Sequence, residues 1–155
     1  MIQRIQSLYL SFVILLSILF CYGTVFSFNN DAGNSLKLIL TGVLNEEGGQ
    51  YFARAGFTWI LPATLVLIIL LSIVAILMFR NRRIQMLLAI SLIVLSVILI
   101  ATLSFYIFYA VSYYKLTIVP ELKMAIPVMI LLFSLLAYKG IRKDDSLIKS
   151  YDRLR

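Results

Sequence analysis

The chain has 155 residues, of which 62% are hydrophobic and only 14% are charged; its mean hydropathy is +1.00 and its formal net charge is +7. About a quarter of the residues in soluble globular domains are charged, so this composition excludes that class and predicts an integral membrane protein. With no His and a single Cys, the chain lacks the commonest metal ligand and cannot form an internal disulfide. No pattern of residues predicts a catalytic, cofactor-binding or metal site, so we expect no enzymatic activity and no cofactor.

Windows free of charged residues predict the helices that cross the membrane. The hydrocarbon core is about 30 Å thick, which roughly 20 apolar residues span as a helix. Windows at residues 5–30, 55–79 and 84–114 meet this requirement, and a shorter one at 124–138 crosses with help from lysine stems that snorkel at its ends. The prediction is an all-α membrane protein, a four-helix transmembrane bundle that forms one domain over residues 1–155. Its spans are expected near residues 6–28, 57–79, 85–110 and 122–139.

The first window resembles a signal peptide, because Arg4 precedes an apolar stretch over residues 8–20. No small-residue cleavage site follows it, however, and Phe20 is too bulky to precede a lipoprotein-type cleavage at Cys21. We therefore expect an uncleaved span. Ser and Thr residues inside the windows are expected to return their hydroxyls to carbonyl groups of their own helices.

The loop between the first two spans, residues 29–56, has room for structure of its own. Its apolar, partly β-branched stretch at 36–44 is followed by a turn signal at 45–49 and a second short apolar run at 51–53. This order predicts a small two-stranded β-hairpin. The alternative is an interfacial helix over 35–44, which Gly42 and the β-branched residues disfavour.

The third window is too long for the membrane alone, since a helix over residues 84–114 measures about 46 Å. Its end should project outside. Four tyrosines share one side of that end: Tyr106, Tyr109, Tyr113 and Tyr114. They are expected either to pack against the hairpin or to form an aromatic belt at the headgroups together with Trp59, and the two are compatible.

The distribution of charge predicts the orientation. One side of a four-span protein would carry the whole net charge of +7, from Arg4, Arg80, Arg82, Arg83, Lys139, Arg142, Lys143, Lys149, Arg153 and Arg155 against Asp144, Asp145 and Asp152. On the other side, acidic and basic residues balance. Because basic residues in short loops stay inside, both termini are expected in the cytoplasm.

Residues 140–155 form the predicted cytoplasmic tail. Gly140 is expected to end the fourth helix, and Asp144 or Asp145 to cap a short amphipathic helix that lies along the inner headgroups. Its aspartates argue against a simple lipid anchor and favour contact either with a protein surface or with the base of the protein's own bundle. The turn RNRR sets topology or adds an anionic-lipid or partner site. The candidate docking residues for a partner or anionic lipid are Arg80, Arg82, Arg83, Arg142, Lys143, Asp144, Asp145, Lys149, Asp152, Arg153 and Arg155.

Four features of the sequence also carry a resemblance: the opening MIQRIQSLYL, the turn FRNRRIQ, a proline early in the fourth span, and the ending AYKGIRKDDSLIKSYDRLR. Together they resemble an uncharacterised tetraspan inner-membrane family of the Bacteroidetes, whose members begin with M-I-Q-R-I-Q and end in a K-D-E-x-L-V-R-S-x-D-R-L-R type tail. The resemblance covers the full length, with mild departures at Asp145, Ile148, Lys149 and Tyr151. It implies a bacterial inner-membrane location and no assigned activity.

The concentration of distinctive polar residues on one side predicts a docking role. We expect a non-enzymatic inner-membrane protein, a subunit or scaffold that docks a cytoplasmic or membrane partner through its basic inner face. The alternative is a binder or carrier of lipid or of a small apolar ligand within the helix bundle. The expected partners are membrane lipids and a protein at the cytoplasmic face, with no nucleic acid.

Overall fold

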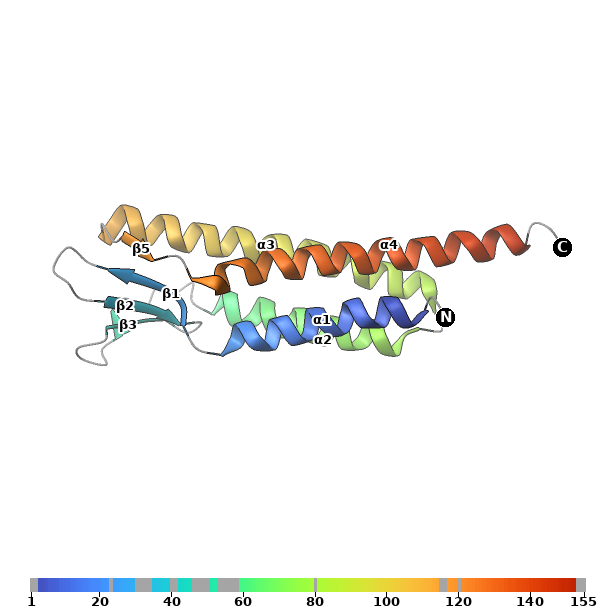
Figure 1. Ribbon diagram of the computed structural model, residues 1–155, viewed down its shortest axis with the longest axis horizontal. Coiled ribbons are helices and arrows are strands. Elements are labelled where there is room, and N and C mark those ends of the chain that lie inside the picture. Colours follow the sequence, from blue (N-terminus) through green and yellow to red (C-terminus); the bar gives the residue numbers. More distant parts are fainter. Residues whose placement is uncertain are drawn as a thin grey trace.

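Four helices run side by side and a small sheet lies at one end of them (Figure 1). The computed structural model describes the backbone of residues 3–22, 24–29, 35–39, 42–45, 51–52, 59–79, 81–114, 117–119 and 121–152. Side chains are described at 5–22, 24–25, 27, 59–79, 81–108, 111–112 and 121–146. The helices are α1 (Gln3–Cys21), α2 (Ile60–Leu77), α3 (Arg82–Tyr114) and α4 (Ile126–Asp152), the last preceded by a 3-10 turn, η1 (Leu122–Ala125).

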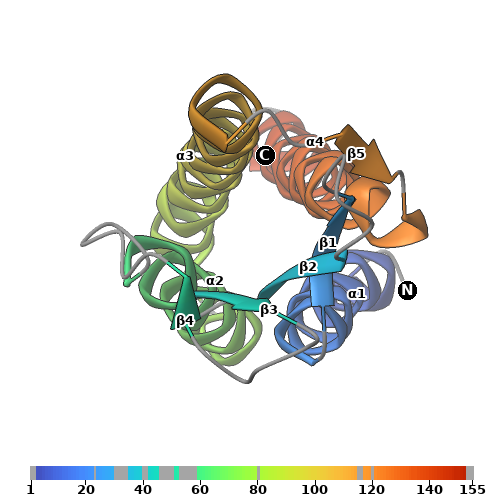
Figure 2. The ribbon, with the colours of Figure 1, turned by 90° about the vertical axis from the view of Figure 1, so that its left-hand side faces the viewer.

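The helices form a ring in chain order, in which α1 packs against both α2 and α4 (Figure 2).

Pro62 lies in the first turn of α2 and Pro127 in the first turn of α4, where the N–H groups have no helical partners in any case. We call the end that holds the start of α1, the α2–α3 turn and α4 after Lys139 the basic end. The opposite end is the sheet end.

Each helix buries one row of residues spaced by three or four positions. The rows are Gln6, Leu10, Val13, Ser17 and Phe20 in α1; Leu61, Leu65, Ile68, Ser72 and Ala75 in α2; Gln85, Ala89, Leu92, Ser96, Leu99, Leu103 and Tyr106 in α3; and Ile126, Ile130, Ser134, Ala137, Ile141 and Asp144 in α4. This spacing places a continuous seam on the inner face of each helix, as in other antiparallel bundles. Each row contains a serine, and small residues let helices approach closely where lipid provides no hydrophobic driving force.

The buried serines satisfy their hydroxyl groups locally. Ser17, Ser96 and Ser134 each donate to a carbonyl oxygen three or four residues earlier in their own helix, at 2.8 Å. This confirms the expectation for these three residues. The Ser72 hydroxyl is the exception, since it is buried with no hydrogen-bond partner among the described residues.

The outer faces of the helices are apolar. Leu15 on α1, Leu70 on α2 and Leu87 on α3 are 56%, 54% and 67% exposed, and many large apolar side chains share these faces. A continuous apolar exterior of this kind marks a surface that contacts lipid. Three helical segments among the described residues are long and apolar enough to cross a membrane, Ile60–Leu77, Arg82–Phe108 and Leu122–Ser146, while the apolar part of α1, Ile5–Cys21, is shorter.

The charge-free window predicted a first helix that continues to residue 28, but α1 ends at Cys21. Strand β1 (Thr24–Asn29) follows at once. Its sequence, TVFSFN, is rich in β-branched and aromatic residues, which favour a strand although they are as apolar as a span.

The first connection contributes to a sheet that is larger than the predicted two-stranded hairpin. Its strands β2 (Ser35–Ile39), β3 (Gly42–Asn45) and β4 (Tyr51–Phe52) join β1 and β5 (Thr117–Val119) in the order β4-β3-β2-β1-β5. The stretch predicted as one strand over 36–44 is therefore divided between β2 and β3, which pair antiparallel with Ile39 opposite Gly42. β3 in turn pairs with β4. The turn predicted at 45–49 lies, apart from Asn45, outside the described residues.

A lysine and a glutamate fasten the sheet end. Lys123 donates its ammonium group to the carbonyl oxygens of Tyr22 at 2.9 Å and Thr24 at 3.0 Å, and Ser27 on β1 donates to the carboxylate of Glu121. Strand β1 also pairs with β5, with Phe28 opposite Ile118. These contacts join the exit from α1 to the entry into α4.

The third helix is one continuous element of 33 residues, and its end lies beside the sheet, as its length predicted (Figure 1). Tyr106 is buried in the core of the bundle and is only 9% exposed. Tyr109, Tyr113 and Tyr114 have side chains outside the described set. Trp59, at the start of α2, is 75% exposed and suits an aromatic belt.

The predicted break at Gly140 is absent, because α4 continues as a single helix to Asp152. Gly140 serves a different purpose. A Cβ atom at this position would lie 3.0 Å from Cγ of Gln6, so the glycine permits α1 and α4 to approach closely. Gly140 therefore belongs to the helix–helix interface and is not a helix end, and the described residues up to Asp152 form no separate C-terminal helix.

Replacing Gly140 by Leu should force α1 and α4 apart at the basic end. Over-packing of this kind costs about 1–3 kcal/mol, so we expect a lower midpoint of thermal unfolding in detergent. Ser146→Leu, an exposed position on the same helix, is the matched control and should leave the midpoint close to that of the wild type. Equal midpoints for Gly140→Leu and the wild type would contradict the close approach.

Candidate binding site at the basic end of the bundle

Segments far apart in the sequence meet at the basic end. Gln6 near the start of α1, Gln85 in the first turn of α3 and Asp144 on α4 are 4%, 4% and 7% exposed. Each continues the buried row of its own helix, so polar side chains replace the aliphatic ones in the last layer of the bundle. We call Gln6, Arg82, Gln85 and Asp144 the basic-end cluster.

Each member of this cluster takes part in a hydrogen bond between two helices. The Gln6 amide donates from Nε2 to the carboxylate of Asp144, which joins α1 to α4. Arg82 donates from Nη1 to the backbone oxygen of Asp144 at 3.0 Å, which joins α3 to α4. Gln85 donates from Nε2 to the backbone oxygen of Ala75 at 3.2 Å, which braces the turn between α2 and α3.

A pocket of about 490 Å³ opens beside the cluster. Its polar lining consists of Gln6, Ser7, Arg82, Gln85 and Asp144, and its apolar lining of Ile76, Leu77, Phe79 and Ile141. Ligand sites in proteins have volumes of about 300–1,000 Å³, and this pocket falls within that range. It is the candidate functional site of the protein.

The chemistry of this lining is that of a recognition site. Arg82 has five N–H donors, of which one is used in a hydrogen bond to Asp144. The carboxylate of Asp144 accepts one hydrogen bond, from Gln6, and a carboxylate can accept about four. A cationic and an anionic group thus line one pocket, and the hydrogen bonds between described residues use only part of the capacity of each.

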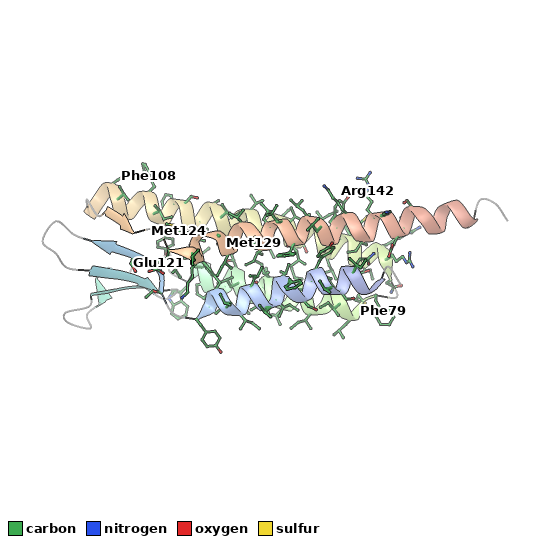
Figure 3. The ribbon with its side chains drawn as sticks, viewed as in Figure 1. Phe79, Phe108, Glu121, Met124, Met129 and Arg142 are labelled. Carbon is green, nitrogen blue, oxygen red and sulfur yellow. The ribbon has the colours of Figure 1, made fainter. Side chains whose placement is uncertain are left out.

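The predicted docking residues are divided between two environments. Asp144 faces inward and belongs to the cluster, where it caps no helix, and Arg82 is partly buried beside it. Arg83, Arg142 and Lys143 are exposed, and Arg142 points away from the bundle (Figure 3). The side chains of Arg80, Lys149, Asp152, Arg153 and Arg155 lie outside the described set, and Asp145 is half-buried.

Sequence reasoning missed Gln6 and Gln85 as functional residues. A signal for both was available, because each lies four residues before the next member of its buried row, Leu10 and Ala89. A polar residue at such a position is buried and needs a partner. Among the described residues, no group of three His, Cys, Asp or Glu side chains gathers closely enough to hold a metal ion.

The apolar exterior and the three membrane-length helices define a helical membrane protein whose polar pocket lies at one end of the bundle. Over residues 2–154 the chain matches the family of the domain of unknown function (DUF4293), and it belongs to that family. No curated protein and no solved structure matches the chain.

The bond between Gln6 and Asp144 predicts a measurable coupling. Gln6→Met alone leaves a buried carboxylate without its donor, which should destabilise the protein by about 1–3 kcal/mol. The double variant with Asp144→Leu removes both partners and should lose less stability than the sum of the single variants. Thermal unfolding of the four proteins in one detergent measures this difference, and strictly additive losses would contradict the bond.

Proposed function

We propose that the protein is a non-enzymatic, four-span protein of the bacterial inner membrane, with its basic end in the cytoplasm, and that it docks a cytoplasmic protein there. The observation that supports docking best is the continuity of α4. Because α4 does not break at Gly140, it extends past the other helices at the basic end, in line with the bundle (Figure 1).

The position of α1 in the ring supports the proposal of four spans. α1 has 19 residues and measures about 28 Å, close to the thickness of the hydrocarbon core. It packs along α2 and α4 and exposes Leu8, Leu15 and Ile18 on its outer face, as the other helices do. This contact with the membrane-length helices, together with the apolar outer face, supports a position of α1 at the same depth in the membrane.

The charge of the basic end supports its cytoplasmic position, because basic residues flanking spans are retained inside. Exposed Arg83, Arg142 and Lys143 lie there. A helix that projects in line with the bundle leads away from the membrane, whereas a lipid anchor would lie along the headgroups. A protein with an acidic surface is thus the partner that this end suits best.

The orientation is tested with single cysteines in a Cys21→Ser background, since Cys21 is the chain's one cysteine. Leu122→Cys, at a side chain that is 96% exposed, should react with a membrane-impermeant maleimide on spheroplasts. Gln3→Cys and Ser146→Cys should react only after the membrane is broken. Labelling of Gln3→Cys on intact spheroplasts would show that α1 does not cross the membrane. Labelling of Ser146→Cys on intact spheroplasts would show that the bundle is inverted.

Docking is tested by removing the projecting end of α4 without disturbing the cluster. Deletion of residues 147–155 leaves Asp144 in place, so the protein should insert and fold. A photo-crosslinking residue at Lys143 should form a protein adduct in intact cells that the deletion abolishes, while the same residue at Leu122 at the sheet end should not form that adduct.

The matched control is a tail of the same composition with residues 147–155 scrambled. If docking depends on a defined surface, this tail should abolish the adduct as the deletion does. An adduct of unchanged yield with either the deleted or the scrambled tail would exclude specific docking by the tail.

A further inference from the structure

We propose that the basic-end pocket binds the headgroup of phosphatidylethanolamine, through the phosphoethanolamine unit that joins a phosphate ester to a primary ammonium. In this arrangement Arg82 receives the phosphate and Asp144 receives the ammonium. The inference does not depend on the docking role, because it uses the buried side of α4 and not the projecting tail.

The two charged groups determine the class of ligand. Arg82 presents a guanidinium group, whose planar fork suits phosphate oxygens, at the positive end of the α3 dipole. Asp144 lines the same pocket with a carboxylate that is only 7% exposed, which repels a purely anionic headgroup. A ligand with both charges satisfies both groups, whereas a simple anion satisfies only one.

The amide groups extend this match. Gln6 and Gln85 each use one amide N–H in a hydrogen bond to the protein, and no described residue donates to either side-chain carbonyl oxygen, so both oxygens can accept from a primary ammonium. A primary ammonium has three donors to distribute among such oxygens and the carboxylate of Asp144, and a quaternary ammonium has none. The lining therefore favours ethanolamine over choline.

The apolar residues indicate that the source is a lipid and not a soluble phosphate ester. Leu77 and Phe79, which line the pocket, are 70% and 55% exposed at the end of α2. Leu77 is the last residue of the membrane-length helix α2, and Phe79 follows two residues later (Figure 3). At this level the headgroup region begins, so both side chains can contact the glycerol and the first acyl carbons.

Native mass spectrometry of the full-length protein in detergent tests this proposal. Phosphatidylethanolamine, phosphatidylglycerol and phosphatidylcholine with the same acyl chains are added in turn. The wild type should retain the ethanolamine lipid about tenfold better than either of the others, the effect of one charge-assisted contact. Comparable retention of all three lipids would overturn the proposal, and so would a preference for phosphatidylglycerol.

Substitutions assign the two ends of the headgroup. Arg82→Gln should lower retention of phosphatidylethanolamine about tenfold, and Asp144→Asn should bring its ratio to phosphatidylglycerol close to one. The matched controls, Arg83→Gln and Asp145→Asn, remove the same charges at the adjacent positions, which do not line the pocket. Both control variants should retain the lipid as the wild type does. Wild-type retention by both pocket variants, or equal losses in the controls, would overturn the assignment.

Two further measurements separate folding and ligand source from binding. Arg82→Lys keeps the charge and should keep most of the retention, and an elution volume in size-exclusion chromatography equal to that of the wild type shows that each variant is folded. Soluble phosphoethanolamine should not displace the bound lipid at equal concentration. If it does, the site recognises a soluble phosphate ester and the lipid source is wrong.

Discussion

The contact between α1 and α4 is the constraint on which the rest of the molecule depends. These helices lie at opposite ends of the chain, so no short connection joins them, and the ring of four closes only through non-covalent contacts. At the basic end, Gly140 lets the backbones approach and Gln6 bonds to Asp144. At the sheet end, the β1–β5 pairing and the Lys123 bonds perform the same function. Between these two closures lies a seam of aliphatic, aromatic and small residues, which includes the stacked rings of Phe12 and Phe133. Lipid supplies no hydrophobic driving force for this contact.

Both closures use polar groups because of where they lie. In the hydrocarbon core, an unpaired polar group is expensive, and the described serines there return their hydroxyls to their own helices, Ser72 excepted. At the ends of the bundle water is near, so a polar side chain costs less free energy there, and hydrogen bonds between helices can fix which residues pair. The basic-end cluster therefore joins α1 and α3 to α4, and the same residues line the pocket. Its residues hold the bundle together and retain hydrogen-bonding capacity for a ligand.

Much of this fold could be predicted from the sequence, because long charge-free windows identify apolar helices without any tertiary information. Their ends were harder to place. β1 is as apolar as a span, so hydropathy alone extends α1 by seven residues, and only the β-branched and aromatic pattern indicates a strand. The sheet also depends on the pairing of β1 with β5, which lie about 90 residues apart in the sequence. Local patterns reveal strands but not their long-range partners.

The candidate site shows a similar division. Arg82 and Asp144 were identified from their charge, Arg82 as part of the turn between the second and third spans. Asp144 was predicted to cap a separate short helix, because a glycine followed by aspartates is the usual signature of a helix end and a new cap. That signature is local, whereas the role of Gly140 is set by Gln6, which lies at the other end of the chain. The spacing of the buried rows is the physical signal that resolves the conflict: Asp144 continues the row Ile130, Ser134, Ala137 and Ile141, so the helix must continue and the carboxylate must face inward. A charged residue at a seam position is then evidence for a hydrogen-bond partner inside the molecule, which for Asp144 is Gln6. The same carboxylate can accept further hydrogen bonds, and this capacity is what points to a ligand.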